Sequence, residues 1–591
     1  MLTRQSFVFL LFSILVQSAV FAQSNLIPSS TTNYSKEIED RIRQVEKDFF
    51  VKFAVKGQNL PTLQDQMAAF HVNGLSIAVI NDYKVEWVKG YGWANVKEKK
   101  QVTPETLFEP GSISKSLNAL GVMKLVQDKK IDLQTDINNY LKSWQFPYDT
   151  ISHGKKITVA NLLSHTAGLT VHGFPGYYYG QKFPTIVQIL DGSKPANTSP
   201  VRSMFEPGLR FEYSGGGTMI SELIQMDMTG KRYDQYIQDA VFSPLGMSNS
   251  FFTQPPPASK KALLATAYGG DGKSIKGGHP ILIEQAAGGL WTTPSDLAKF
   301  VIDVQLSAQG KSNKVLNTAT TQLMLTPYID ERSALGVFID NRNGTKYFQH
   351  DASNQGFSGQ YYASLEEGKG VVIFINSDAG FVVVNQLLNS VARVYKWKGI
   401  GDQQGSVVKE TIDLPAATTK NYTGLYREQK GGMAVITEKD GSLWYRAGGG
   451  NQWKMYFVSP TVFFNMESTT EKNFYSNPDG TIAGYTRTLD GRELAKVEKV
   501  NIVQLPDSLL QQYAGTYTAS DGNIGKAVIR DRSLWLEGDG DKRKIYFIST
   551  TKFYMAEDDA VEYTVLIGTD GKPTGISGKK DGEERVFKKT K

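Results

Sequence analysis

The segment FEPGSISKSLNALG, residues 108–121, places a lysine three positions after a serine at the start of an apolar run. Residues three apart share one face of a helix, so the side chains of Ser112 and Lys115 would meet. A serine in a first helical turn also presents its backbone N–H to a developing oxyanion. A lysine carried into a partly buried site beside the serine would act as the base that takes its proton. The segment predicts either an activated serine nucleophile or a helix-capping serine followed by a surface charge.

The spacing Ser-x-x-Lys is common by itself, because it recurs at Ser152, Ser406, Ser549 and Ser577. The copy at Ser112 differs from these because it both follows a glycine and opens a long apolar helical run. Two later segments favour the catalytic interpretation. They are RFEYSGGG, which contains Tyr213, and YFQHDASNQG, which contains His350 and Ser353.

A serine, a tyrosine and a basic residue in this order resemble the serine β-lactamase and penicillin-binding-protein superfamily. The closest resemblance is to class C β-lactamases and their esterase and D-aminopeptidase relatives, and it covers about residues 60–400 through phrases such as TVANLLSHTAGL and QAAGGLWTTPSDLAKF. The resemblance implies that Ser112 attacks an acyl carbon while Lys115 and Tyr213 share the proton transfers. It also implies that His350 lies on the strand beside the site and that the N–H of Ser353 completes the oxyanion hole.

Three positions depart from the pattern of that superfamily. Gly215 stands where an asparagine is frequent, which removes an amide that would hold the substrate. Ala352 stands where glycine is usual, and His350 replaces a lysine that would offer a fixed positive charge to a carboxylate. These departures favour a peptidase or esterase over a strong β-lactamase.

The order of β-rich and helical segments predicts an α+β domain. Strand-like runs at residues 75–80 and 84–92 are predicted to form a hairpin, residues 361–378 return to strands, and mostly helical sequence separates the two regions. Helices are expected at Tyr34–Phe53 and Val382–Trp397. The resemblance implies a β-lactamase/transpeptidase-like catalytic domain, with an antiparallel sheet flanked by helices and a helical subdomain, over residues 23–402.

An internal repeat follows this domain. The segment Leu414–Tyr426 matches Leu505–Tyr517, and three further blocks match at the same offset of about 90 residues. Short β-like runs with glycine and aspartate turns fill both copies. We therefore expect two tandem small β-barrels, at residues 411–500 and 504–591, and both resemble the lipocalin-like domains that follow many secreted hydrolases.

The N-terminus has the pattern of a secretory signal. Arg4 precedes an apolar run from Phe7 to Val16, and the VFA motif places a cleavage site after residue 22. The alternative is an uncleaved anchor, although the run is short for a membrane span. The chain contains no cysteine, so the mature protein would lack disulfides. We expect a periplasmic or secreted protein with no stable membrane span after cleavage.

Other classes of function find little support in the residues. The net charge is only +6, and no basic run with interleaved aromatics suggests nucleic acid as a partner. Neither G-x-S-x-G nor H-E-x-x-H occurs, and no cofactor or metal is expected. His165, within LLSHTAGL, is interpreted as a hydrogen-bonded structural histidine.

These observations predict an exported serine hydrolase that cleaves amide or peptide bonds through a Ser112 acyl-enzyme. Its expected substrates are small molecules or peptides, including cell-wall fragments with D-residues. A carboxylesterase or a β-lactamase is the near alternative. A different class is a penicillin-binding-like sensor that acylates without turnover, or a protein that only binds.

Overall fold

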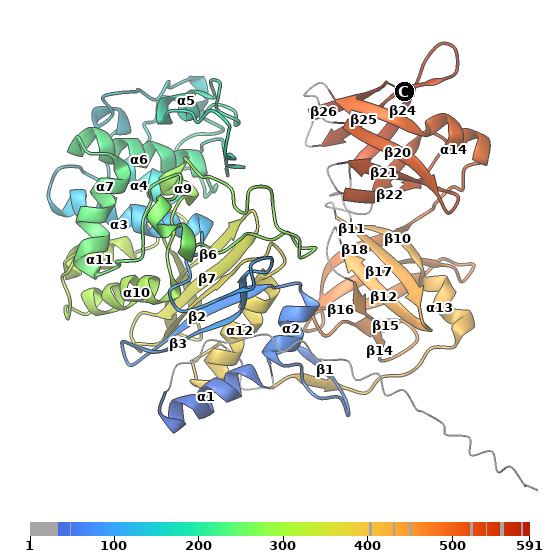
Figure 1. Cartoon of the computed structure of the whole chain (residues 1–591), viewed down its shortest axis with the longest axis horizontal. Helices are drawn as coiled ribbons and strands as arrows, with labels where there is room; N and C mark the ends of the chain where they lie inside the picture. Colours follow the sequence, from blue (N-terminus) through green and yellow to red (C-terminus); the bar gives the residue numbers. More distant parts are fainter. Residues whose placement is uncertain are drawn as a thin grey trace, which may run out of the picture.

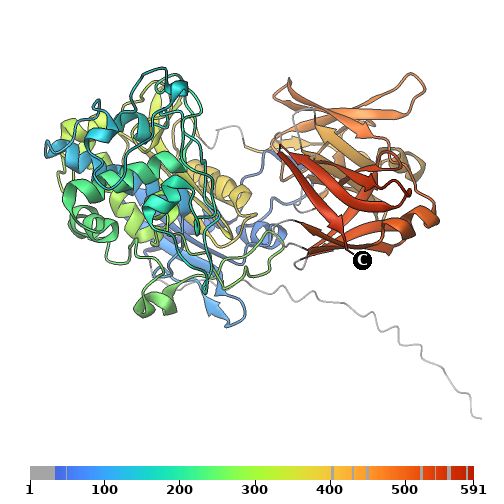
Figure 2. The ribbon, with the colours of Figure 1, turned by 90° about the horizontal axis from the view of Figure 1, so that it is seen from above.

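The computed structural model describes residues 34–590, except 48, 401–404, 429–431, 448–451, 520–523, 539–540, 556–560 and 581–582. The predicted signal peptide, residues 1–22, lies outside the described residues. Residues up to about 400 form a unit of helices packed on a sheet, and two β-barrels lie beside it (Figures 1 and 2). Among the described helices, none is long and apolar enough to cross a membrane.

The first unit is built on a seven-stranded sheet with the order β4-β3-β2-β8-β7-β6-β5, and every neighbouring pair is antiparallel. Its strands are β2 (Gly74–Asn81), β3 (Lys84–Asn95), β4 (Lys100–Gln101), β5 (Phe338–Arg342), β6 (Thr345–Asn354), β7 (Phe357–Ser364) and β8 (Gly370–Ile375). The pairing of β2 with β8 joins the N-terminal and C-terminal parts of the unit. The predicted hairpin is confirmed, since Asp82 and Tyr83 turn between β2 and β3 with φ of 50° and 57°.

Helices cover both faces of this sheet. Side chains alternate along β2, so Ala78 packs toward α3 (Ser114–Gln127) and α10 (Pro294–Ala308), whereas Ile77 packs toward α1 (Lys36–Glu46) and α12 (Phe381–Val394). The predicted α+β, β-lactamase-like fold is therefore confirmed. The expected helix Tyr34–Phe53 was too long, because α1 ends at Glu46 and Phe53 begins strand β1 (Phe53–Val55).

The segment between β4 and β5 supplies most of the helical part of the unit, seen at the upper left of Figure 1. One further helix, α2 (Leu63–Ala69), precedes β2. Besides α3 and α10, the segment between β4 and β5 contains α4 (Val159–Leu163), α5 (Ile186–Asp191), α6 (Gly215–Thr229), α7 (Tyr233–Ile237), α8 (Ser243–Leu245), α9 (Gln285–Gly288), α11 (Thr318–Met324), the 3₁₀ turns η1 (Gly111–Ile113), η2 (Ile137–Asn139), η3 (Thr150–Ser152) and η5 (Ala258–Leu263), and the π turn η4 (Gln238–Phe242).

The two tandem β-barrels predicted from the repeat are present. The first is a nine-stranded, nearly closed sheet of β10 (Gly424–Glu428), β11 (Met433–Lys439), β12 (Ser442–Ala447), β13 (Trp453–Lys454), β14 (Tyr456–Phe457), β15 (Val462–Phe464), β16 (Glu471–Ser476), β17 (Ile482–Leu489) and β18 (Arg492–Val500). The second is a closed barrel of β19 (Gly515–Ala519), β20 (Ile524–Arg530), β21 (Ser533–Gly538), β22 (Asp541–Phe547), β23 (Lys552–Met555), β24 (Glu562–Ile567), β25 (Pro573–Lys580) and β26 (Glu583–Lys589).

The repeated Y-x-G-x-Y motif has the same structural role in both barrels. It joins a short helix, α13 (Ala416–Tyr422) or α14 (Asp507–Tyr513), to the first strand of its barrel. The second tyrosine donates its hydroxyl back to the carbonyl oxygen of the first, from Tyr426 to Tyr422 at 2.6 Å and from Tyr517 to Tyr513 at 2.7 Å. The glycine between them has φ of 145° in each copy, a conformation that side chains disfavour.

The first barrel packs against the N-terminal part of the first unit. Strand β1 pairs in parallel with β9 (Val407–Lys409), which lies just before the barrel. The ring centres of Phe53 and Phe464 are 5.4 Å apart, and those of Phe70 and Trp453 are 4.3 Å apart. Aromatic contacts of this kind bury large apolar areas, so the barrel stabilises this edge of the unit.

Candidate active site

The predicted nucleophile lies in a tight turn between the sheet and the helical part. Ser112 belongs to η1, and α3 begins two residues later at Ser114. The serine therefore precedes the first α-helical turn instead of lying within it, but Lys115 still reaches back to it. The side chain of Lys115 is only 4% exposed, so this lysine is not a surface charge.

Two polar groups converge on the hydroxyl oxygen of Ser112. The Lys115 Nζ lies 3.2 Å from Oγ and also donates to the carbonyl oxygen of Ala287 at 2.7 Å. The Tyr213 hydroxyl lies 2.8 Å from the same Oγ. The Lys115 Nζ is in addition 5.0 Å from the centre of the Tyr213 ring. The structure thus brings Ser112, Lys115 and Tyr213 together, although Ser112 and Tyr213 are 101 residues apart along the chain.

The serine turn is held against the end of β6. Gly111 has φ of +46°, and a Cβ there would lie 3.0 Å from the carbonyl oxygen of Ser353, so only glycine fits this approach. The carboxyl of Glu109 accepts the side-chain N–H of Asn354 at 2.9 Å, and its burial raises its pKa well above the usual range. These contacts set the distance between the nucleophile and Ser353.

His165 contacts Tyr213 and the residue that follows it. Its Nδ1 accepts the backbone N–H of Ser214 at 3.3 Å, and its ring centre lies 4.3 Å from that of Tyr213. Burial and the nearby Lys115 lower the pKa of His165 well below its usual value, so the ring is neutral. The interpretation of His165 as a hydrogen-bonded structural histidine is confirmed.

The two residues predicted on β6 have different surroundings. Ser353 lines the pocket that contains Ser112. His350 is 3% exposed, and its ring centre is 6.5 Å from that of Tyr213. Its Nδ1 donates to the carbonyl oxygen of Asp351 at 2.8 Å, while burial and Lys115 lower its pKa to about 3. His350 is therefore a neutral imidazole, in agreement with the expected absence of a fixed positive charge.

The pocket at Ser112 has a volume of about 110 Å³. It is lined by Gly111, Ser112, Lys115, His172, Gly173, Phe174, Gly215, Leu282, Glu284, Ala287, Gly288, Ser353 and Asn354. A Cβ on Gly215 would lie 3.0 Å from the Phe174 ring, so the aromatic side chain occupies the space that a larger residue at 215 would need. Phe174, Glu284 and Ala287 were missed by sequence reasoning, because no spacing pattern connects them to the serine.

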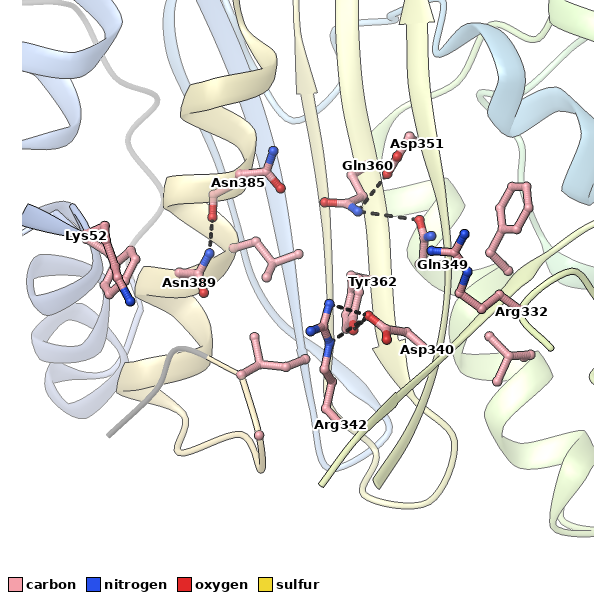
Figure 3. Close-up of a pocket in the computed structure, with 16 residues that line it drawn as sticks. Lys52, Arg332, Asp340, Arg342, Gln349, Asp351, Gln360, Tyr362, Asn385 and Asn389 are labelled. Atoms are coloured by element: carbon pink, nitrogen blue, oxygen red, sulfur yellow. Dashed lines mark hydrogen bonds and ion pairs between the residues drawn. The ribbon is translucent and has the colours of Figure 1, made fainter. Parts of the chain in front are cut away.

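A second, larger hollow of about 610 Å³ lies on the opposite face of β6 and β7 (Figure 3). Asp351, the neighbour of His350, points into it and accepts the side-chain N–H of Gln360 at 2.7 Å. Its described lining includes none of the five predicted site residues. The two linings share no residue, and the adjacent side chains of His350 and Asp351 point to opposite faces of the sheet.

The arrangement at Ser112 suits acyl transfer. A hydroxyl contacted by an amine and a phenol has two groups that can move its proton, and the pocket gives an acyl group access to the oxygen. Among the described residues, no group of three or more histidine and acidic side chains is placed to hold a metal ion. Every role in this chemistry can be assigned to side chains and backbone of the chain itself.

Comparisons with known proteins show which family this chain resembles. Residues 61–393 match the family model described as beta-lactamase. Protein flp of Staphylococcus aureus is 24% identical over 329 residues, which cover 53% of this chain and 61% of the relative. The teichoic acid D-alanine hydrolase of the same organism is 25% identical over 260 residues, which cover 43% of this chain and 60% of the relative. The chain thus matches about 60% of the length of these curated relatives.

Solved structures similar to this one include an octameric penicillin-binding protein homologue from Pyrococcus abyssi, with a TM-score of 0.49 and 20% identity over 81% of this chain and 97% of that one. A D-amino acid amidase from Ochrobactrum anthropi has a TM-score of 0.47 and 20% identity over 61% of this chain and 98% of that one. The match of the family model extends over more than half of the sequence, from α2 to α12. The chain belongs to the beta-lactamase family.

Proposed function

We propose that this protein is an exported serine hydrolase that cleaves amide and peptide bonds, including bonds to D-residues, through an acyl-enzyme on Ser112. The observation that carries the proposal is the convergence of Lys115 Nζ, at 3.2 Å, and the Tyr213 hydroxyl, at 2.8 Å, on one serine oxygen. Export is proposed from the pattern of residues 1–22.

The proposed reaction has two halves. The Ser112 hydroxyl gives its proton to the Lys115 and Tyr213 pair as Oγ attacks the acyl carbon. The oxyanion is received by the backbone N–H groups of Ser112 and Ser353. The pair then returns the proton to the departing amine, and the acyl group remains on Oγ. In the second half, water gives a proton to the same pair and attacks the acyl carbon. The pair then returns this proton to Oγ as the bond between Oγ and the acyl carbon breaks, which releases the acid and regenerates Ser112.

The substrate class is proposed from chemistry and from a relative. The neutral His350 offers no fixed cation to a substrate carboxylate, in contrast to the lysine expected for a strong β-lactamase. A relative named teichoic acid D-alanine hydrolase supports acyl groups of D-amino acids as substrates. Cell-wall fragments that carry D-residues meet both conditions.

Covalent labelling tests the nucleophile. A fluorophosphonate should label the protein once, at Ser112, because among the serines that the structure describes only this one has the contacts with Lys115 and Tyr213 given above. Peptide mapping by mass spectrometry locates the adduct, and Ser112→Ala should abolish it. An adduct on another serine would overturn the mechanism.

Turnover separates an enzyme from a sensor. We expect continuous release of product from at least one member of a panel of D- and L-aminoacyl amides, short esters and a cephalosporin, with no release by Ser112→Ala. A single burst equal to the enzyme concentration would instead identify a protein that acylates without turnover.

A chain that ends at residue 402 tests what the barrels contribute. All residues that line the Ser112 pocket precede this point, so we expect activity on a small ester to persist. The melting temperature should fall, because the truncation removes β9 and exposes Phe53 and Phe70. Loss of small-ester activity in a truncated chain that circular dichroism shows to be folded would mean that the barrels help to form the site.

A further inference from the structure

One wall of the Ser112 pocket carries a carboxylate that the mechanism above does not use. Glu284 directly precedes α9, the short helix whose Ala287 carbonyl accepts from Lys115. Its side chain is fully buried, and it lines the same 110 Å³ pocket as Ser112. A carboxylate so near a nucleophile needs a physical explanation.

Three buried glutamates surround this wall, and two of them have partners. Glu109 accepts from Gln254 at 3.2 Å and from Asn354 at 2.9 Å. Glu222 accepts the backbone N–H of Ala286 at 2.7 Å. In the described part of the chain, neither carboxylate oxygen of Glu284 has a hydrogen-bond partner on another residue.

An orphaned buried carboxylate is unfavourable, because burial removes water without replacing its hydrogen bonds. A ligand that donates a hydrogen bond to Glu284 would replace the hydrogen bonds that this carboxylate lost on burial. A protonated amine suits the position best, since an ammonium has N–H donors and no acceptor, whereas an ionised carboxylate only accepts. Hydrogen bonds between two such ions are among the strongest in proteins.

We infer that Glu284 binds the free, protonated α-amino group of the substrate, so that the substrates are amides or esters of small α-amino acids. The inference rests on the proposed function, because it places the acyl carbon at Ser112. The α-amino nitrogen of an amino acid is separated from that carbon by a single atom. An acyl group held at Ser112 in a pocket of this size therefore carries its ammonium toward Glu284.

The size and electrostatics of the pocket agree with this assignment. A volume of 110 Å³ equals that of roughly four liquid waters, which suits an acyl group as small as alanyl. Burial raises the pKa of Glu284 to about 7, so this carboxyl is partly protonated at neutral pH. An arriving ammonium favours the ionised form, so ionisation and binding reinforce each other.

Substrate analogues with one leaving group test the inference on the wild-type enzyme. The series is D- and L-alanine p-nitroanilide, their N-acetyl derivatives and propionic acid p-nitroanilide, which has the shape of the alanine compound without its amine. We expect kcat/KM for the preferred alanine enantiomer to exceed that for the propionyl and N-acetyl compounds by at least about tenfold. Equal or faster cleavage of the N-acetyl compounds would overturn the inference.

Variants then assign the effect to one side chain. Glu284→Gln should lower kcat/KM for alanine p-nitroanilide by about 10- to 100-fold, as expected for a lost hydrogen bond between ions. Its kcat/KM for the propionyl compound should stay within about threefold of wild type. Glu222→Gln is the matched control, because it removes an equally buried carboxylate that already has a partner, and it should leave the alanine-to-propionyl ratio unchanged.

The outcomes distinguish this inference from the proposed function. Fluorophosphonate labelling of Glu284→Gln at Ser112 shows that the variant is folded, and the wild-type comparison needs no variant. Cleavage of the propionyl compound that depends on Ser112, without preference for alanine, leaves the hydrolase proposal intact and rejects amine recognition. A Glu284→Gln variant that lowers both rates equally also rejects it. Cleavage that survives Ser112→Ala rejects the proposed function itself.

Discussion

Replacing Lys115 by arginine should lower the acylation rate constant by at least about two orders of magnitude, the usual contribution of a general base. The guanidinium of arginine stays protonated at any usable pH, so it cannot accept the serine proton. It is also larger than an ammonium, and the Lys115 Nζ is already confined between Ser112 Oγ at 3.2 Å and the Ala287 carbonyl at 2.7 Å. Single-turnover kinetics with an excess of enzyme measure the effect directly.

Lys124→Arg is the matched control for this experiment, because Lys124 lies on the same helix, far from the serine, and pairs with the exposed Asp128. Circular dichroism and the melting temperature should be alike for both variants. A folded Lys115→Arg enzyme that acylates within a few-fold of wild type would show that Tyr213 accepts the serine proton without help from the lysine.

The second large effect concerns the stability of the first barrel. Lys472, in β16, is 2% exposed and points into the barrel, where its Nζ donates to Asn465 Oδ1 at 3.2 Å and to Ser468 Oγ at 3.4 Å. Burial, together with the nearby Arg487, lowers its pKa to about 7. The second barrel has no lysine at the equivalent position. Tyr563 pairs there with Phe553, as Lys472 pairs with Phe463 in the first barrel.

Lys472→Met should therefore raise the stability of the first barrel at pH 6.5. In the unfolded chain the lysine pKa is about 10.4, so between pH 7 and about 10 the unfolded state binds more protons and the wild-type barrel gains stability as the pH rises. Below pH 7 the lysine is charged in both states, and the cost of burying this charge in the folded barrel is on the order of 4 kcal/mol. The methionine variant avoids this cost but loses the two hydrogen bonds of Lys472. We expect a melting transition at least about 10 °C higher in the variant, measured by calorimetry of the full chain.

Two comparisons secure the assignment. Lys439→Met removes an exposed lysine from the same barrel and should leave the transition and its pH dependence unchanged. The first unit should respond in the opposite sense above about pH 6.5, because burial raises the pKa of Glu222 to about 8. At this carboxyl the folded state binds more protons than the unfolded chain between about pH 4.3 and 8, so the contribution of Glu222 to stability falls as the pH rises through that window. A Lys472→Met barrel no more stable than wild type at pH 6.5 would show that the lysine is neutral or hydrated there.

Local sequence patterns determined much of the protein. The spacing of Ser112 and Lys115, the hairpin at residues 81–83 and the apolar helix at 381–394 follow from short-range geometry, in which residues three apart on a helix or two apart on a strand must share a face. The barrels could be predicted because two copies of one pattern reinforce each other. The end of the first helix could not be predicted in this way, because Phe53 pairs and packs at the first barrel and belongs to strand β1 instead of the helix.

The remaining features were decided only by tertiary structure. Resemblance to a family, not spacing, associated Tyr213 with the serine, and the fold brings its hydroxyl within 2.8 Å of Ser112 Oγ across 101 residues. No pattern marked Glu284, Phe174 or the Ala287 carbonyl, because their importance comes from the side of the pocket on which they lie. The neutrality of His350 likewise depends on burial and on the nearby Lys115, which are properties of the packed site. A sequence specifies which groups are present, but their pKa values and partners depend on distances and on excluded water, which only the folded chain defines.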